Sequence, residues 1–298
     1  MSAQIIDGTR LATEMRTEIA AQVADLKANR NITPGLGVIL VGNDPASLSY
    51  VTAKERACAA AGMLSREIRL PEETTQNDLL NCVEQMNQDP LIHGILVQLP
   101  LPRHIDEKAV INAISPAKDV DGFTPVNVGR MLIDEPCFLP CTPHGIIQML
   151  IRAGVETSGK HAVVIGRSNI VGKPVAHLLM RKARGGNATV TVCHTGTPDL
   201  AHHTRQADIV IAAAGRPNTL TGDMLKPGAV VIDVGVNRIP DTSRKSGFRL
   251  AGDAQFESVS QVASMVTPVP GGVGPMTITM LLHNTLESCL RTCATTLP

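Results

Sequence analysis

Residues 36–54 read LGVILVGNDPASLSYVTAK, and this stretch decides the fold of the first half of the chain. The apolar run at its start is typical of a strand that is buried on both faces. Asp44 is a favoured helix N-cap and Pro45 suits the first helical position, so a helix is expected to start there. Gly62 is suited to end that helix. The stretch therefore predicts a buried strand followed by a helix, the repeating unit of an α/β fold.

Three chemically active side chains share one face of this predicted helix. Ser47, Tyr50 and Lys54 fall within roughly 60° of arc, since each helical residue turns the chain by about 100°. The same stripe continues through the small residues Ala57 and Ala61, so the face is expected to point inward. Burial lowers the pKa of a lysine, and a partly neutral amine can move protons near neutral pH. The alternative is a lysine that merely extends past a packed tyrosine to reach water.

Strand and helix patterns alternate along the rest of the first half. Residues 10–29 and 75–88 have helical patterns, and residues 65–70 and 94–99 have strand patterns. Prolines crowd the region 100–143 and interrupt helices there, which marks a domain junction.

A second α/β pattern begins at His161, where HAVVIG, ATVTVCH, ADIVIAAAG and AVVIDVGV read as buried strands. The polar residues 237–249 are expected to form a loop or hairpin, and residues 275–289 to form a final helix. We therefore expect an α/β fold with two domains. They are an open α/β domain at 1–142, completed by a C-terminal helix at 279–298, and a Rossmann-like domain with a parallel sheet at 143–278.

The composition narrows the possible partners. Lys plus Arg equals Asp plus Glu, at 27 each, and aromatic residues make up 2% of the chain. Balanced charge and few aromatic rings argue against nucleic acid as the main partner. No apolar run approaches the ~20 residues of a membrane span, and residues 1–16 lack a signal-peptide core, so no membrane association is expected. The seven cysteines match no strong zinc pattern, so we expect free thiols in a reducing compartment and no metal.

The turn after the first strand of the second half has the pattern of a phosphate-binding site. In VVIGRSNIVGKP, Gly166, Ser168 and Gly172 lie between a strand and a helix start. Such a turn presents N–H groups that suit a pyrophosphate, although this one is not GxGxxG, and a plain turn is the alternative. The next strand ends at residues 193–195 without the acid that commonly binds the ribose of NAD, whereas Arg167 suits the 2′-phosphate of NADP. His194 either contacts the nucleotide or is a structural histidine whose hydrogen bonds are satisfied within the protein.

Two other glycine-rich segments are weaker signals. Residues 154–161, GVETSGKH, nearly match a P-loop, but the final Ser or Thr is missing and the segment precedes a strand. An ATP site is therefore rejected. Residues 267–277, TPVPGGVGPMT, form a stiff loop before the last helix, which either shapes a turn or allows close approach of a ligand.

Polar groups in the first half point to a second site. Gln98 lies at the end of an apolar strand, where it either satisfies a neighbouring turn or points a donor into a cleft. In KDVDGF, Asp119 and Asp121 share a turn with too few oxygen ligands for calcium. One acid is expected to make local turn bonds, and the other to accept hydrogen bonds from the N–H groups of a ligand.

Together these motifs resemble the methylenetetrahydrofolate dehydrogenase/methenyltetrahydrofolate cyclohydrolase family. The segments that carry the resemblance lie in order over nearly the whole chain: VGNDPASLSYVTAKERACAAAG, HGILVQLPLP, KDVDGF, PCTPHG, VVIGRSNIVGKP, ATVTVCHTGT, ADIVIAAAG, VVIDVGVN and TPVPGGVGPMT. The resemblance implies a bifunctional enzyme of one-carbon metabolism, linked to purine biosynthesis. It would oxidise 5,10-methylenetetrahydrofolate with NADP and then hydrolyse the methenyl product to 10-formyltetrahydrofolate.

The resemblance also implies roles for single residues. Lys54 would be the central cyclohydrolase residue and would pair with Gln98, and Asp121 would hold the pterin ring. The catalytic set is then Lys54, Tyr50, Gln98, Asp121 and Ser47. The substrate would contact Tyr50, Lys54, Gln98, Leu99, Asp121, Pro270, Gly271 and Gly272. NADP would contact Gly166, Arg167, Ser168, Ile170, His194, Thr195, Ala214, Gly215, Val236 and Thr277.

The family implies a homodimer formed through the nucleotide-binding domain, in the cytoplasm or alternatively in the mitochondrial matrix. Three other functions stay open. A monofunctional dehydrogenase of the family would not hydrolyse the methenyl species, and an unrelated NADP oxidoreductase would not depend on folate. A non-catalytic NADP-binding sensor would tolerate the loss of Lys54 and Asp121.

Overall fold

The computed structural model describes residues 2–244 and 247–295. The chain forms two compact units. We call residues 13–141 with 278–295 the three-stranded unit, and residues 2–12 with 142–244 and 247–277 the six-stranded unit. Each is described by itself.

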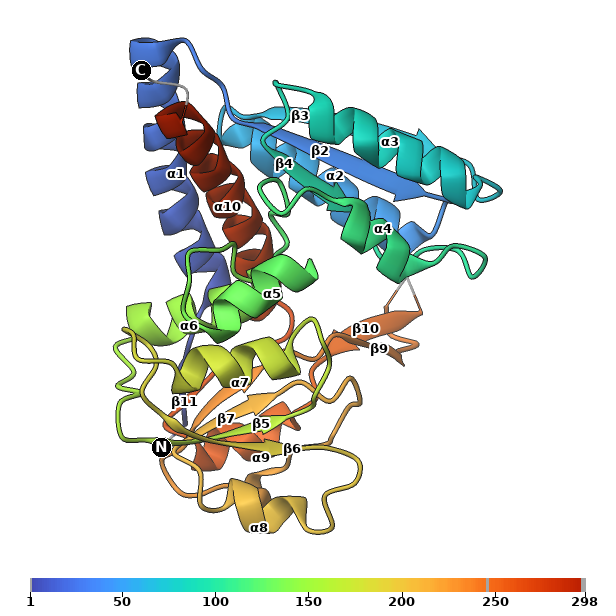
Figure 1. Cartoon of the computed structure of the whole chain (residues 1–298). Helices are drawn as coiled ribbons and strands as arrows, with labels where there is room; N and C mark the ends of the chain where they lie inside the picture. The colour runs from blue at the N-terminus through green and yellow to red at the C-terminus, as the bar shows by residue number, and fades with distance from the viewer. Residues whose placement is uncertain (1, 245–246, 296–298) are drawn as a thin grey trace. The chain divides into compact units, whose positions relative to one another are not determined.

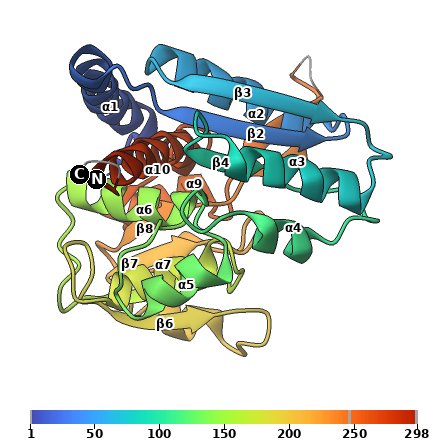
Figure 2. The same cartoon turned by 45° about the horizontal axis from the view of Figure 1, so that its top comes forward.

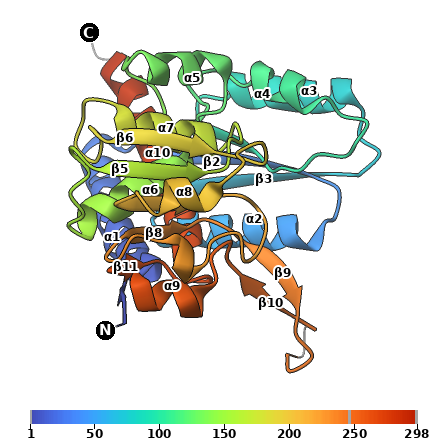
Figure 3. The same ribbon diagram turned by 90° about the horizontal axis from the view of Figure 1, so that it is seen from below.

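The three-stranded unit is a parallel sheet in the order β3-β2-β4. All seven residues of the central strand are buried, as its apolar run predicts. Helix α2 lies on one face of the sheet and α3 and α4 lie on the other (Figure 3). A side chain at Gly37 would meet the Met86 sulfur at 2.7 Å, so this glycine lets α3 approach the strand closely. The elements are β2 (Gly35–Val41), α2 (Pro45–Ala60), β3 (Leu64–Leu70), α3 (Gln76–Gln88), β4 (Gly94–Val97), α4 (Glu107–Ala113) and α5 (Pro125–Leu132).

Two long helices complete this unit from opposite ends of the sequence. Most of α1 (Gly8–Arg30) and most of α10 (Val273–Thr295) belong to it. They lie side by side (Figures 1 and 2), and the Arg16 Nε donates to the Thr279 hydroxyl at 2.9 Å. The last helix thus begins at Val273, two residues before the predicted start, because Pro275 fits within a first helical turn.

The six-stranded unit is a fully parallel sheet in the order β1-β11-β8-β7-β5-β6. Its buried strands read as apolar runs, as expected for a sheet covered on both faces; examples are Ile209–Ala212 and, up to its final aspartate, Val230–Asp233. Within the segment 237–249, which was expected to form a loop or hairpin, β9 pairs antiparallel with β10, and residues 245–246 lie outside the described residues. The elements are β1 (Gln4–Ile5), α6 (Cys141–Arg152), β5 (His161–Ile165), α7 (Gly172–Met180), β6 (Thr189–Cys193), α8 (Leu200–Thr204), β7 (Ile209–Ala212), the 3₁₀ turn η1 (Gly222–Met224), β8 (Val230–Asp233), β9 (Asn237–Pro240), β10 (Phe248–Ala251), α9 (Phe256–Val262) and β11 (Met265–Val266).

The structure confirms the α/β class and corrects one part of the predicted organisation. Residues 2–12 were expected in the first domain, but they belong to the six-stranded unit. The reason is strand β1, in which Gln4 pairs with Met265 and Ile5 with Val266. A two-residue strand at the edge of a sheet has no periodicity that a sequence pattern can detect.

No helix among the described residues is long and apolar enough to cross a membrane.

Candidate functional site

The amine of Lys54 is held at the carboxyl end of the three-stranded sheet. Asp44 caps α2, where its carboxylate accepts the Ser47 N–H at 2.8 Å. Three turns into the helix, the Lys54 Nζ donates to the Gln98 Oε1 at 2.9 Å, which is the expected pairing. The Gln98 amide in turn donates to the Leu99 carbonyl at 2.6 Å. Both functional groups of the glutamine are therefore satisfied, and its oxygen is fixed toward the amine.

Burial shifts the ionisation of Lys54 toward the neutral amine. Desolvation lowers the Lys54 pKa, while nearby Asp121, Cys141 and Cys58 oppose that shift. Burial also raises the pKa of Asp121, and Lys54 acts against that rise. An amine and a carboxyl group are thus both pushed toward their neutral forms in one place, as acid–base sites often require.

The two acids of the KDVDGF turn have separate roles. Asp119 is buried, and one of its oxygens accepts the N–H and the hydroxyl of Thr124 at 2.8 and 2.7 Å and the Asn127 amide at 2.9 Å. Its other oxygen accepts the Phe123 N–H at 3.2 Å. Asp119 is therefore the acid that makes the local turn bonds. Asp121 interacts with Lys54 and with the Cys141 thiol.

Cys141 is a neighbour of this site that sequence reasoning did not single out. Its thiol donates to the Val120 carbonyl at 3.2 Å, and burial raises its pKa well above the ordinary value. The Asn284 amide on α10 donates to the carbonyls of Val120 at 2.8 Å and Leu139 at 3.0 Å. One side chain from the last helix thus ties the Asp121 turn to the Cys141 segment. The PCTPHG motif marked this position only as part of a family pattern.

The helix face predicted to point inward does so only in part. Ser47 is 3% exposed, and Ala57 and Ala61 are also buried. Tyr50, however, is 47% exposed, so its predicted inward orientation is wrong. A tyrosine ring is amphipathic, and the period of a helix gives its direction but not whether another element covers it. Its ring is accessible, whereas the Ser47 side chain is not.

The predicted phosphate turn connects β5 to α7 in the six-stranded unit. Gly166 has φ +122°, and a side chain there would meet the Ala213 carbonyl at 2.1 Å, so only glycine fits. The Ser168 hydroxyl accepts the N–H groups of Val171 and Gly172, both at 3.2 Å. Two of the N–H groups that the turn was expected to present, those of Val171 and Gly172, are therefore already bonded to the serine hydroxyl. A hydroxyl that accepts two bonds still has its own proton to donate.

The other predicted nucleotide contacts lie after the ends of neighbouring strands. Arg167, Ile170 and Thr195 are exposed beside β5 and β6. The His194 Nδ1 accepts the Gly196 N–H at 3.0 Å, which is a structural bond within the turn. Val236, after β8, is 51% exposed.

A buried carboxylate binds the backbone of the segment that follows β7. The N–H groups of Ala214 and Gly215 donate to one oxygen of the buried Asp253, at 2.6 and 2.8 Å. Thr277 at the start of α10 shares a hydrogen bond with the Thr142 hydroxyl at 2.9 Å.

The predicted folate-lining segment packs against the start of α1. The Thr9 N–H donates to the Gly271 carbonyl at 3.0 Å, and a side chain at Gly8 would meet the Gly272 carbonyl at 1.8 Å. The missing side chain at Gly8 therefore lets the start of α1 approach the backbone of residues 271–272, and Pro270 lies beside them. Among residues 2–244 and 247–295, no three His, Cys, Asp or Glu side chains form a group that could hold a metal ion.

Known proteins resemble this chain over almost its whole length. Two family models match: the tetrahydrofolate dehydrogenase/cyclohydrolase catalytic domain at residues 6–121 and its NAD(P)-binding domain at residues 140–293. The chain is 59% identical to the "Bifunctional protein FolD" of Prosthecochloris aestuarii over 96% of this chain and 98% of that protein. It is 57% identical to the protein of the same name from Moorella thermoacetica, over 98% and 100%.

Solved structures agree with the sequence comparison. The bifunctional FolD methylenetetrahydrofolate dehydrogenase/cyclohydrolase of Campylobacter jejuni has a TM-score of 0.92 and 46% identity, over 98% of this chain and 100% of that one. The FolD of Trypanosoma brucei, complexed with NADP cofactor and inhibitor, has a TM-score of 0.93 and 42% identity, over 98% and 99%. With the Lys54–Gln98 pair and the parallel six-stranded sheet in place, the chain belongs to the tetrahydrofolate dehydrogenase/cyclohydrolase family.

Proposed function

We propose that this protein oxidises 5,10-methylenetetrahydrofolate to the 5,10-methenyl cation with NADP and then hydrolyses that cation to 10-formyltetrahydrofolate. The observation that carries the proposal is the hydrogen bond from the Lys54 amine to Gln98, with Asp121 beside it, in a chain of this family. Relatives named as bifunctional share more than half of their residues with it.

Lys54 supplies the proton transfers of the hydrolytic step. Water attacks the methenyl carbon, and the neutral amine takes the proton that the water loses. The C–N5 bond then breaks as the new hydroxyl becomes the formyl carbonyl: the ammonium returns its proton to N5, and the remaining hydroxyl proton leaves to solvent. Because the methenyl substrate is itself a cation, its presence disfavours the ammonium and adds to the effect of burial on the Lys54 pKa. The Gln98 oxygen orients the amine throughout.

Asp121 and the residues near it bind the folate. The Asp121 carboxyl group accepts hydrogen bonds from the amino and ring N–H groups of the pterin. The exposed ring of Tyr50 is available to a flat ligand, and Leu99 adds apolar contact. Ser47 supports the first turn of α2 beneath them. In the six-stranded unit, the segment Pro270–Gly272 is assigned to the folate side.

The donors at the carboxyl edge of the six-stranded sheet fit NADP. Arg167 and Ser168 are exposed in the turn between β5 and α7, where a guanidinium and the following helix N-terminus favour phosphate groups. A side chain at Gly215 would meet nothing within 4 Å, so the chain leaves open space above this residue. When bound, NADP accepts the hydride in the first step. The chain's own part is to hold it through the predicted contacts at Gly166, Ile170, His194, Thr195, Ala214, Val236 and Thr277.

The assembly proposed is a homodimer through the six-stranded unit. Strand β6 is at the edge of its sheet, and Val192 on it is 40% exposed. An uncovered edge strand can pair with a second copy. Light scattering is expected to give the mass of two chains, and the mass of one chain would contradict the proposal. We place the enzyme in the cytoplasm, in the one-carbon supply to purine biosynthesis, with neither nucleic acid nor membrane as a partner.

Two separate assays test the catalytic proposal. The purified protein is expected to reduce NADP⁺ when given 5,10-methylenetetrahydrofolate, and to hydrolyse added methenyltetrahydrofolate without nucleotide. Reduction without hydrolysis would show a monofunctional dehydrogenase. Binding of NADP with neither reaction would show a sensor instead.

A further inference from the structure

Two buried carboxylates lie beneath the carboxyl edge of the six-stranded sheet, and neither belongs to the predicted site. Asp233 is the last residue of β8, and Asp253 follows β10. They are 4% and 0% exposed. A buried acid is rarely retained without hydrogen-bond partners, so the partners of these two are informative.

Asp253 joins two segments that leave neighbouring strands. One oxygen accepts the N–H groups of Ala214 and Gly215 at 2.6 and 2.8 Å, in the segment after β7. The other oxygen accepts the Asn237 side-chain amide at 2.9 Å, in the segment after β8. These are charge-assisted bonds, which are the stronger kind.

Asp233 holds Asp253 in place. Its carboxylate accepts the N–H groups of Asp253 at 2.8 Å, Ala254 at 2.9 Å and Gly235 at 3.0 Å. The two acids therefore form one unit that ties residues 213–215, 233–237 and 252–254 together. Burial raises the pKa of Asp233 to about 6, against the effect of these bonds.

Glycines next to the acids show how tightly this network is built. A side chain at Gly235 would meet the Asp253 Oδ1 at 2.2 Å, and one at Gly252 would meet the Asp233 Oδ2 at 1.8 Å. The carboxylates occupy the space that a side chain would need, so only glycine fits at these two positions.

In an open parallel sheet, ligands bind outside the carboxyl ends of the strands, which is where these segments lie. We propose that Asp253 is a positioning residue for the nucleotide: it fixes Ala214–Gly215 and the Asn237 segment in their binding geometry before the cofactor arrives. This inference rests on the proposed function, since it assigns Ala214, Gly215 and Val236 to the cofactor. Preorganised groups pay less ordering cost on binding, so loss of the carboxylate weakens cofactor affinity.

Asp253→Asn is the sharpest variant. An amide keeps one oxygen, so its NH₂ group faces either the two backbone N–H groups or the Asn237 NH₂ group. One side of the connection is lost while the size of the side chain is kept. We expect the Kd for NADPH to rise at least tenfold and the KM for NADP⁺ to rise in parallel. Hydrolysis of methenyltetrahydrofolate, assayed without nucleotide, is expected to stay within twofold.

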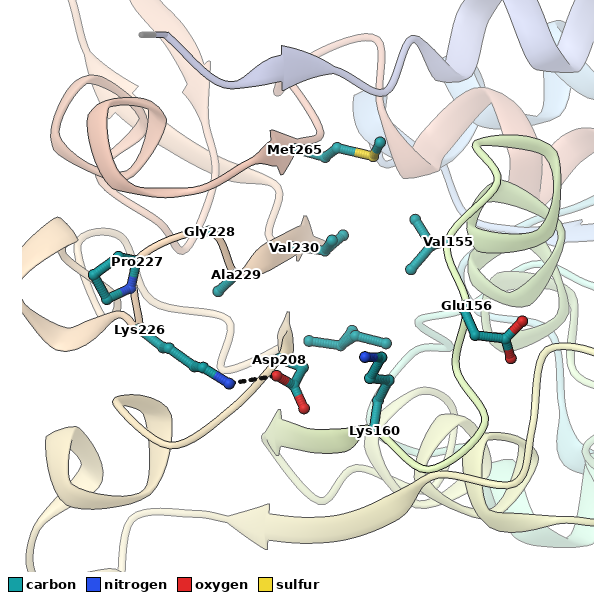
Figure 4. Close-up of a pocket in the computed structure, with 11 residues that line it drawn as sticks. Val155, Glu156, Lys160, Asp208, Lys226, Pro227, Gly228, Ala229, Val230 and Met265 are labelled. Atoms are coloured by element: carbon teal, nitrogen blue, oxygen red, sulfur yellow. Dashed lines mark hydrogen bonds and ion pairs between the residues drawn. The ribbon is translucent and has the colours of Figure 1, made fainter.

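Asp208 provides a matched control at the opposite edge of the same sheet. It lies just before β7, accepts the His161 N–H at 3.0 Å and pairs with Lys226 at 2.6 Å. Figure 4 shows this pair at a cavity of about 290 Å³ by the amino ends of the strands. Asp208→Asn also removes a carboxylate that accepts a backbone N–H. It therefore shows how far a general loss of stability in this unit changes the Kd for NADPH. It is expected to lower Tm while leaving the Kd for NADPH within twofold.

The outcomes separate this inference from the proposed function. A wild-type protein that binds no NADPH would remove the proposed function. Normal wild-type activity with an unchanged Kd in folded Asp253→Asn, or an equal loss in Asp208→Asn, would overturn the inference alone. If Asp253→Asn does not fold, amide hydrogen exchange of the wild type decides. The N–H groups of Ala214 and Gly215 are expected to exchange slowly without nucleotide, and fast exchange until nucleotide binds would overturn the inference.

Discussion

Replacing Lys54 with methionine should separate the two reactions of this enzyme. Met keeps the length and apolar character of the stem but removes the amine that donates to Gln98 at 2.9 Å. General acid–base catalysis contributes about 10²–10⁴-fold, so hydrolysis of methenyltetrahydrofolate is expected to fall by that factor. This equals about 3–5 kcal/mol of barrier, at 1.36 kcal/mol for each tenfold change in rate. Hydride transfer needs alignment more than a proton, so its rate is expected to change less than tenfold.

The protein should stay folded, because two effects on stability oppose each other. The Gln98 oxygen loses its donor, which costs about 1–3 kcal/mol if the oxygen stays buried. Replacing the amine also removes the free-energy cost of keeping it out of water, the same desolvation that lowers the Lys54 pKa. Unfolding measured by circular dichroism is therefore expected to change little, and the kinetic loss can be assigned to chemistry.

Lys118→Met is the matched control. Burial lowers the pKa of Lys118 as well, but its amine donates to the carbonyls of Met86 at 3.1 Å and Asp89 at 2.8 Å. Loss of this amine is expected to lower the free energy of unfolding and to leave the rate of hydrolysis within about threefold of the wild type. The reasoning is refuted if Lys54→Met slows both reactions equally or slows neither, or if Lys118→Met has the same effect.

Three further predictions concern the six-stranded unit and the thiols. The folded pKa of Asp233, about 6, exceeds its usual 3.8, so its stabilising contribution is present at low pH and lost as pH rises through 6. This group should lower the unfolding free energy by roughly 2 kcal/mol between pH 4 and pH 7, and Asp233→Asn should lack that slope; an unchanged slope would contradict the assignment. Arg167→Gln is expected to lower kcat/KM for NADP⁺ about 10- to 100-fold while changing that for NAD⁺ little, and an equal loss for both would exclude a 2′-phosphate contact. Cys137 is the one cysteine of the seven that is not buried, so a thiol reagent should modify one group quickly in the native protein and none in Cys137→Ser.

Local sequence signals predicted the elements that carry this site. The Asp44 cap, the Pro45 helix start and the buried strand before them are all present, because caps and apolar runs act over a few residues. Local turn bonds by one acid of KDVDGF were also expected, and the family resemblance assigned the ligand to Asp121, but the spacing of the two acids alone did not show which would make the turn bonds. That choice depends on Thr124 and Asn127, which surround Asp119 only after the chain has folded.

Features that depend on distant contacts were missed. Strand β1 forms only because β11, far along the chain, offers an edge. The inward orientation predicted for Tyr50 was wrong, since helical periodicity does not say what covers a face. Asp253 had no signal either, because its partners at Ala214 and Asn237 are separated from it by 39 and 16 residues.

The central physical claim is that the Lys54 amine is desolvated and therefore neutral more easily than an ordinary lysine. NMR titration of protein with ¹³C-labelled lysine tests it directly, with the Lys54 signal identified by its absence from the Lys54→Met spectrum. We predict a Lys54 pKa clearly below the ordinary 10.5, as burial dictates. A pKa at or above 10.5 would contradict the account and remove Lys54 as the proton-transfer group.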